Sequence, residues 1–185
     1  MGKVVVDMTM SVDGAVAGPS GLPEAGIHDW YFAPSEVSQQ VIQQLIDTTG
    51  AIVMGRRAYD LGVEAGGYDD DPYDVTYFVL THEPPAEPPV TKAQFVFVTD
   101  GPDSAVKQAQ VAAGDRNVVI AGGAQTAQEF LRAGLVDEVR LALRPVVIPG
   151  GVRLFDTLEP GRLRLEGTAA TWTPEATHLV YRVVR

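Results

Sequence analysis

The chain has 185 residues, 45% of them hydrophobic, which predicts one globular domain over residues 1–185 with a core large enough to be stable without cross-links. The absence of Cys excludes disulfides, thiol nucleophiles and cysteine metal sites, and a formal net charge of −10 argues against a nucleic-acid partner. The apolar start is too short for a signal peptide and no apolar run reaches bilayer-spanning length. A cytoplasmic protein without a membrane partner is therefore expected.

The first half of the chain alternates strand and helix patterns. It predicts a strand (residues 4–12), a long loop rich in Gly and Pro (13–30) and a helix capped by Ser35 and ended by Gly50 (35–50). A strand (51–54), a short helical turn (55–57) and an acidic loop (62–74) follow.

The second half begins with the same alternation and then changes period. The alternating part predicts two buried strands (76–80 and 95–99), a helix (103–113), a third buried strand (118–120) and a further helix (124–134). Three stretches follow in which apolar and polar residues alternate: 139–143, 162–166 and 177–184. This order predicts an α/β fold with a mixed sheet that ends in antiparallel strands. Trp172, in a late strand, is expected to pack in the core or at an interface.

The segment from Asn117 to Gly134 combines a buried strand, two glycines and a helix. Gly122 and Gly123 carry no Cβ, so a ligand can approach the main chain there. The unpaired N–H groups and positive dipole end of the following helix favour a phosphate. A tight strand-to-helix connection with no ligand is the alternative.

Two further strand ends carry polar groups. Gly55, Arg56 and Arg57 open a short helix after one strand, and paired guanidiniums suit a phosphate such as the 2′-phosphate that distinguishes NADPH from NADH. Thr81 and His82 follow the next strand. Because open α/β sheets bind ligands at the carboxyl ends of their strands, we expect the three junctions to lie along one sheet edge.

Four segments together resemble the dihydrofolate-reductase-like superfamily, and most closely the reductase domain of the bifunctional riboflavin-biosynthesis deaminase-reductase and its stand-alone relatives. They are DMTMSVDGAVAG (7–18), IVMGRRAY (52–59), VLTH (79–82) and VVIAGGAQTAQEFLRAGLVDEVRLALRPVVIPGGVRLF (118–155). The resemblance covers nearly the whole chain and implies a dihydrofolate-reductase-like three-layer fold and an NADPH-dependent reductase.

The resemblance also implies the cofactor site. The pyrophosphate group is expected on the glycine pair and the helix start, at Gly122, Gly123, Ala124, Gln125 and Thr126. The adenosine phosphate end is expected at Gly55, Arg56, Arg57, Thr81 and His82. The peptide between Gly122 and Gly123 is expected to be cis, as in dihydrofolate reductases.

On the substrate side, the stretch from Ser11 to Gly14 resembles the SxDG motif of the riboflavin-type reductases. Asp13 is therefore the first candidate for proton delivery, with His28, Asp29 and Glu36 as alternatives. A turn residue that bonds its own backbone is the structural alternative for Asp13. The expected substrate-binding residues come from the first strand, the loop and the following helix: Ser11, Asp29, Trp30 and Glu36.

Two departures from the family pattern bear on the substrate. The first long helix offers Ser and Gln in its middle, where dihydrofolate reductases hold the pterin with a carboxylate. Residues 4–55 contain no Lys or Arg, which phosphate recognition normally requires. We therefore expect a neutral or cationic substrate unless Arg144 or Arg153 reaches the cleft, and an acidic rim formed by residues 60–74.

These observations favour a reductase that transfers a hydride from NADPH to a small heterocyclic, carbonyl or imine substrate. A non-catalytic NADPH-binding sensor or scaffold is the alternative, and a dimeric module with an empty cleft is a third hypothesis. A homodimer is expected from the resemblance and from the long C-terminal strands. The three widely spaced histidines predict no metal site.

Overall fold

The computed structural model describes residues 2–184, and its centre is a mixed sheet of eight strands. The strands lie in the order β5-β4-β3-β6-β1-β7-β10-β9, parallel from β5 to β7 and antiparallel for the last two. Their bounds are β1 (Val4–Ser11), β3 (Thr49–Gly55), β4 (Thr76–Leu80), β5 (Gln94–Val98), β6 (Asn117–Gly122), β7 (Glu138–Arg144), β9 (Arg164–Trp172) and β10 (Thr177–Val184). The prediction of a mixed sheet with an antiparallel end is confirmed.

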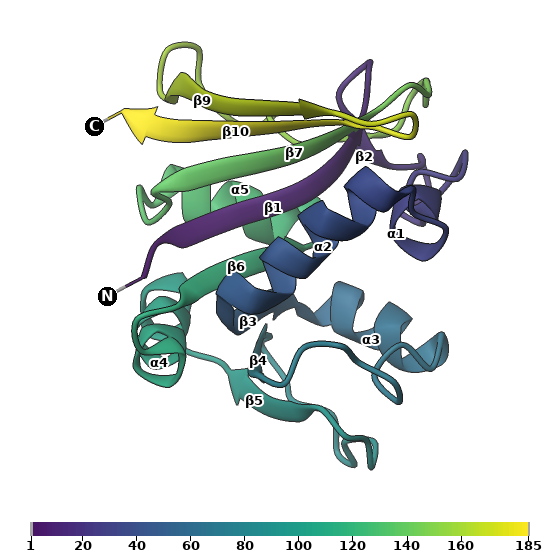
Figure 1. Cartoon of the computed structure of the whole chain (residues 1–185). Coiled ribbons are helices and arrows are strands. Elements are labelled where there is room, and N and C mark those ends of the chain that lie inside the picture. Colours follow the sequence, from purple (N-terminus) through teal and green to yellow (C-terminus); the bar gives the residue numbers. More distant parts are fainter. Residues whose placement is uncertain (1, 185) are drawn as a thin grey trace.

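Helices cover both faces of this sheet. Figure 1 shows α2 in front of the central strands and α5 behind them. Residues of α4 and α5 form the main core with Val4, Val6 and Met8 of β1. The helices are α1 (Asp29–Phe32), α2 (Glu36–Thr48), α3 (Arg56–Glu64), α4 (Pro102–Ala113) and α5 (Ala124–Arg132). In the described part of the chain, none of them combines the length and the apolar character needed to cross a bilayer.

The helix predicted over residues 35–50 begins as expected and ends early. Ser35 is the N-cap of α2 and accepts a hydrogen bond from the Ser38 amide. Gly50, predicted to end this helix, instead lies inside β3. A Cβ at Gly50 would stand 2.7 Å from the Ala113 carbonyl oxygen, so this glycine permits the close approach of the end of α4.

The segment predicted as a loop over residues 13–30 contains two short elements. β2 (Ala15–Ala17) pairs with β8 (Val152–Arg153) in a separate two-stranded sheet, and α1 begins at Asp29. A three-residue strand is too short to show a period, which is why its pattern was not recognisable. This pairing ties the start of the loop to the segment that follows β7.

The two edge strands differ from their predicted burial. β5 was predicted to be a buried strand, but it has one neighbour, β4, and its residues are mostly exposed or half-buried. β9 is exposed along all nine residues, and Trp172 at its end is 73% exposed. The prediction that Trp172 packs in the core is therefore wrong, while its position at an interface remains a prediction.

Candidate functional site

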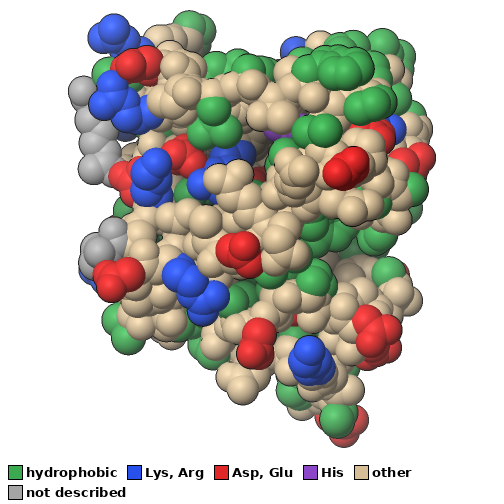
Figure 2. All heavy atoms as spheres, in the orientation of Figure 1, with side chains coloured by type: hydrophobic (Ala, Val, Ile, Leu, Met, Phe, Trp, Pro, Cys, Tyr) green, Lys and Arg blue, Asp and Glu red, His purple; other side chains and the backbone are tan. Residues whose placement is uncertain are grey.

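A cavity of about 1040 Å³ opens along the carboxyl ends of β4, β3 and β6 and extends to the middle of β1. Cavities that hold a single drug-sized ligand span roughly 300–1,000 Å³. The volume of this cavity therefore allows an extended ligand, or a ligand together with a small second molecule. Figure 2 shows the face of the molecule on which α2 lies. On this face, the Lys and Arg side chains lie mostly toward the end that carries the two chain termini.

The three strand-end junctions meet at this cavity. β4, β3 and β6 are consecutive neighbours in the sheet and run parallel, so their carboxyl ends lie side by side. The prediction that the junctions share one sheet edge is confirmed. All ten residues predicted to bind the cofactor line the cavity: Gly55, Arg56, Arg57, Thr81, His82, Gly122, Gly123, Ala124, Gln125 and Thr126.

The start of α5 has room for a ligand. Gly123 is the N-cap and provides no side-chain cap, so the first N–H groups of the helix lack a side-chain acceptor. A Cβ placed on Gly123 would meet no atom within 4 Å. The open space at Gly123 and the uncapped helix end together fit a phosphate group.

The predicted cis peptide between Gly122 and Gly123 is wrong, because the described residues contain no cis peptide bond. Gly122 has a nearly extended φ of 157° and belongs to β6, and Gly123 follows with φ −74° and ψ 179°. The chain thus passes from strand to helix through an ordinary trans peptide.

The two arginines at the start of α3 have partners within the protein. Arg56 Nε donates to Asp60 at 2.8 Å, and Arg56 Nη1 donates to the Glu83 carbonyl oxygen at 2.6 Å. Arg57 Nη2 donates to the Ser20 carbonyl oxygen at 2.5 Å, which holds residues 18–22 against α3. The two guanidiniums therefore connect α3 to the loops on either side of it.

Of the four predicted substrate-binding residues, Trp30 lines the cavity and the other three do not. Trp30 is 4% exposed, and its indole Nε1 donates to Thr9 Oγ1 at 3.0 Å. Ser11 is buried below the turn after β1, whereas Asp29 and Glu36 are exposed in the first turns of α1 and α2. His28, an alternative proton donor, does line the cavity.

Asp13 lies outside the cavity lining and organises the turn after β1. Its carboxylate accepts hydrogen bonds from Ser11 Oγ at 2.6 Å and from the Ile148 amide at 3.0 Å. These two bonds lower the pKa of Asp13. This geometry matches the structural alternative, a carboxylate that bonds nearby backbone and side chains.

Asp7, a carboxylate that the sequence reasoning did not single out, lines the cavity from β1. Burial raises its pKa to about 6, although the positive charge of Arg140 lowers it. One signal was available in the sequence, since an ionisable residue interrupts the apolar run VVVDM. A carboxylate within such a run requires a compensating partner or a function.

The predicted acidic rim does not surround the cavity. None of Asp69, Asp70 and Asp71 belongs to the lining, and Asp71 is buried, where its carboxylate accepts a hydrogen bond from the Tyr77 hydroxyl at 2.7 Å. Arg144 and Arg153 also lie outside the lining. They bind the carbonyl oxygens of residues 175 and 13, respectively.

With this geometry in place, comparison with known proteins decides the family. The model of the RibD C-terminal domain matches residues 2–178. The chain belongs to the RibD C-terminal domain family. Two Bacillus subtilis (strain 168) relatives described as uncharacterized are similar in sequence. YwjB is 27% identical over 90% of both chains, and YyaP is 25% identical over 97% of this chain and 94% of its own.

Solved structures show that the RibD C-terminal domain of this chain has a dihydrofolate-reductase-like fold. A putative riboflavin biosynthesis protein from Shewanella sp. PV-4 superposes with a TM-score of 0.79 at 24% identity, covering 99% of both chains. Acinetobacter baumannii RibD gives 0.68 at 15% identity over the whole of this chain and 59% of its own. Enterococcus faecalis dihydrofolate reductase, solved with NADP(H), gives 0.62 at 14% identity, covering 98% of this chain and 96% of its own.

Proposed function

We propose that the protein is an NADPH-dependent reductase that acts on a small heterocyclic, carbonyl or imine substrate. One observation carries this proposal: all ten residues predicted to bind the cofactor line a single cavity, which continues to a carboxylate and aromatic side chains on β1 and α1. Membership in the RibD C-terminal domain family supports a reductase of the riboflavin-pathway type.

The residues at the sheet edge suit NADPH. The uncapped start of α5 and the open space at Gly123 would hold the pyrophosphate group, and Arg56 and Arg57 would face the adenosine phosphate. Bound NADPH would supply the hydride. The protein would orient the substrate and exclude water from the cavity, whose lining includes apolar surface of Trp30 and Ile52.

Where the reaction requires a proton, we propose water as its source rather than Asp13. The Asp13 carboxylate accepts bonds from Ser11 and Ile148, and its lowered pKa makes it a poor acid at neutral pH. A general acid must also lie within hydrogen-bond reach of the reduced group, and Asp13 does not line the cavity.

NADPH titration with a matched variant tests the cofactor site. We expect NADPH to quench the fluorescence of Trp30, which lies in the cavity, and Gly123→Ala to weaken binding about tenfold or more while leaving the melting temperature unchanged. The added methyl group meets no protein atom, so lost affinity would report the ligand's own contact. Unchanged affinity in Gly123→Ala would contradict the placement of the pyrophosphate group.

Turnover separates the reductase from a non-catalytic sensor or scaffold. Loss of NADPH absorbance with any member of a panel of pterins, aminopyrimidines, imines and small carbonyls would support the reductase. Binding of NADPH without oxidation across the panel would favour the sensor, and the absence of NADPH binding would leave only the module with an empty cleft.

We also propose that the protein forms a homodimer. β9 is an edge strand that is exposed along its length and ends in the largely exposed Trp172. Edge strands with exposed apolar side chains readily pair with another chain. Sedimentation analysis should give a dimer that Trp172→Arg shifts toward monomer, and a monomeric native protein would rule the proposal out.

A further inference from the structure

We propose that the substrate is an organic cation, held by the Asp7 carboxylate and flanked by the aromatic side chains of Trp30, Tyr31 and Tyr73. All four residues line the cavity, and they come from β1, α1 and the segment between α3 and β4. This inference rests on the proposed reductase function and names the charge of its substrate.

The Asp7 side chain has no hydrogen bond or ion pair with any other residue in the described part of the chain. It is partly buried on the wall of the cavity. A carboxylate in such a place is costly unless it is paired. Arg140 on the neighbouring strand gives Asp7 a favourable charge but no hydrogen bond or ion pair, so a cationic ligand would supply the direct partner.

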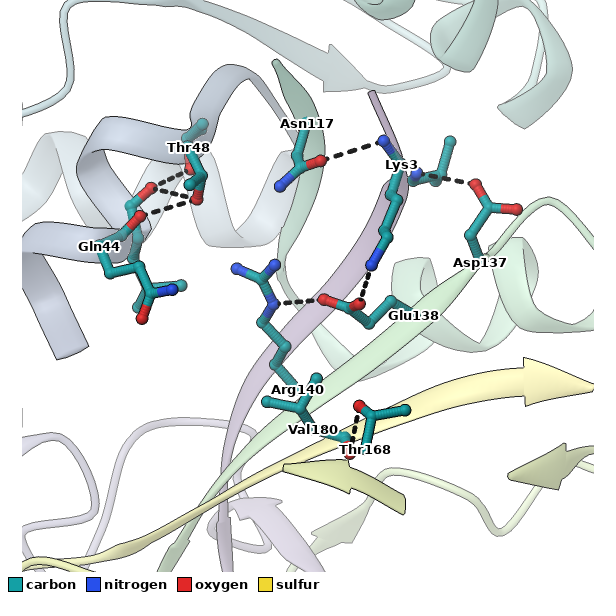
Figure 3. A network of polar contacts seen from close by, with 12 residues as sticks. Lys3, Gln44, Thr48, Asn117, Asp137, Glu138, Arg140, Thr168 and Val180 are labelled. Atoms are coloured by element: carbon teal, nitrogen blue, oxygen red, sulfur yellow. Dashed lines mark hydrogen bonds and ion pairs between the residues drawn. The ribbon is translucent and has the colours of Figure 1, made fainter. Parts of the chain in front are cut away.

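Arg140 is the nearest candidate for an internal partner, because β1 and β7 place it opposite Asp7 in register. Its guanidinium is instead engaged by Glu138, with Arg140 Nε donating to Glu138 Oε1 at 2.7 Å. Glu138 Oε2 also accepts from Lys3 Nζ at 2.6 Å. Figure 3 shows this chain of contacts, in which Arg140 reaches toward Glu138.

Aromatic side chains share the cavity lining with Asp7, and the Trp30 indole is held by a hydrogen bond. The Trp30 indole is anchored to Thr9, which is two residues from Asp7 and therefore on the same face of β1. Tyr73 is close enough to Tyr31 and Asp7 that both contribute, after burial, to raising its pKa. The phenols remain neutral, so their faces can attract a cation while their hydroxyls can donate hydrogen bonds.

The cationic side chains that line the cavity lie at one end of it, whereas carboxylates line both ends, with Glu83 and Glu129 on the expected cofactor side and Asp7 on β1. In the described residues, the Lys and Arg side chains that line it are Arg56 and Arg57, both at the expected cofactor end. Asp7 therefore faces no cationic side chain in the lining near it. This arrangement opposes a phosphate on the substrate and favours a positive charge.

A cation next to the reducible carbon would also simplify the chemistry. Hydride transfer from bound NADPH to an iminium carbon would break the C4–H bond of the nicotinamide, leaving NADP⁺, and would form a C–H bond on the substrate. The C=N π electrons would become the nitrogen lone pair, so no proton is required. The product amine is uncharged when formed. Asp7 would hold this product less tightly than the substrate, which aids release.

The inference can be tested by calorimetry on the protein without NADPH. The probes are N-methylquinolinium, a fixed cation, and quinoline, a neutral molecule of similar shape, at about pH 8. We expect the cation to bind more tightly than quinoline. Asp7→Asn should lower the affinity for the cation about tenfold or more and change the affinity for quinoline little. Asp47→Asn, which removes an exposed carboxylate from α2, should leave both affinities unchanged.

A second readout follows the protonation of Asp7. Lowering the pH from about 8 to about 5 should weaken binding of the cation to the native protein more than to Asp7→Asn. The other charged or titratable groups near this part of the cavity are Arg140, Glu138, Asp71, Tyr31, Tyr73 and His28, and they are present in both proteins. The difference between the two proteins therefore isolates Asp7.

The outcomes separate this inference from the proposed function. Equal affinity for cation and quinoline, or an unchanged cation affinity in Asp7→Asn, would overturn the cationic substrate. The reductase would still stand if NADPH bound and a neutral substrate turned over. Conversely, cation binding that depends on Asp7 would support the site even in a protein that fails to bind NADPH.

Discussion

Thr126 Oγ1 occupies the space that a side chain at position 55 would need. A Cβ added to Gly55 would lie 2.3 Å from this oxygen, well inside van der Waals contact. Gly55 ends β3 and Thr126 lies in the first turn of α5, so the contact joins two of the three strand-end junctions. The close approach brings the two predicted phosphate sites together along one edge.

Gly55→Ala should therefore destabilise the protein by about 1–3 kcal/mol, as overpacking usually does. Thr126→Ala removes the obstructing oxygen, so the double variant should recover most of that loss. Denaturant unfolding of both single variants and the double variant measures the coupling. Simple additivity of the two changes would show that the contact is not the cause.

Arg56→Ala combined with Arg57→Ala should weaken NADPH more than NADH. The reason is that only NADPH carries the extra phosphate that two guanidiniums can bind. Because Arg57 also holds the Ser20 carbonyl oxygen, a moderate loss for both cofactors is expected in addition. Dissociation constants for both cofactors test this prediction, and equal losses would refute the assignment.

Asp7→Asn should stabilise the protein at neutral and alkaline pH. The pKa of Asp7 is raised to about 6, so the folded protein binds this proton more tightly than the unfolded chain. Its stability is therefore greatest when Asp7 is protonated and declines as the pH rises from about 4 through 6. The raised pKa of Asp7 changes the free energy of unfolding by at most about 3 kcal/mol.

Unfolding free energies of the native protein and Asp7→Asn across this pH range provide the measurement. The gain from the substitution should grow as the pH rises and level off above about pH 7. Parallel curves for the two proteins would mean that Asp7 titrates alike in the folded and unfolded chains.

Asp13→Ala should lower the melting temperature without changing NADPH affinity. The substitution removes the acceptor for Ser11 Oγ and for the Ile148 amide, which tie the turn after β1 to the segment after β7. Because the pKa of Asp13 is lowered, its contribution is present at neutral pH and lost as the pH falls through its acidic range. Lost turnover with an unchanged melting temperature would instead restore its predicted role in proton delivery.

Local patterns were sufficient wherever one stretch of chain carries the whole signal. The strand, glycines and helix around Gly122 and Gly123 are contiguous, and so are Gly55 and Arg56 with the strand before them. Parallel α/β topology then places such junctions at one edge. Sequence predictions were wrong where contacts with a distant segment determine the structure. Gly50, for example, was predicted to end a helix but lies within β3, where the end of α4 packs closely against it.

By itself, the sequence determined the α/β class and the polar strand ends of the proposed cofactor site, because periodicity and glycine turns act over a few residues. Only the tertiary structure brought together the residues of the proposed substrate site. Asp7, Trp30 and Tyr73 are up to 66 positions apart and meet because the sheet order and the α3–β4 connection bring them to one cavity. Asp13 has a promising motif but lies outside that cavity, because its carboxylate is bonded to Ser11 and Ile148.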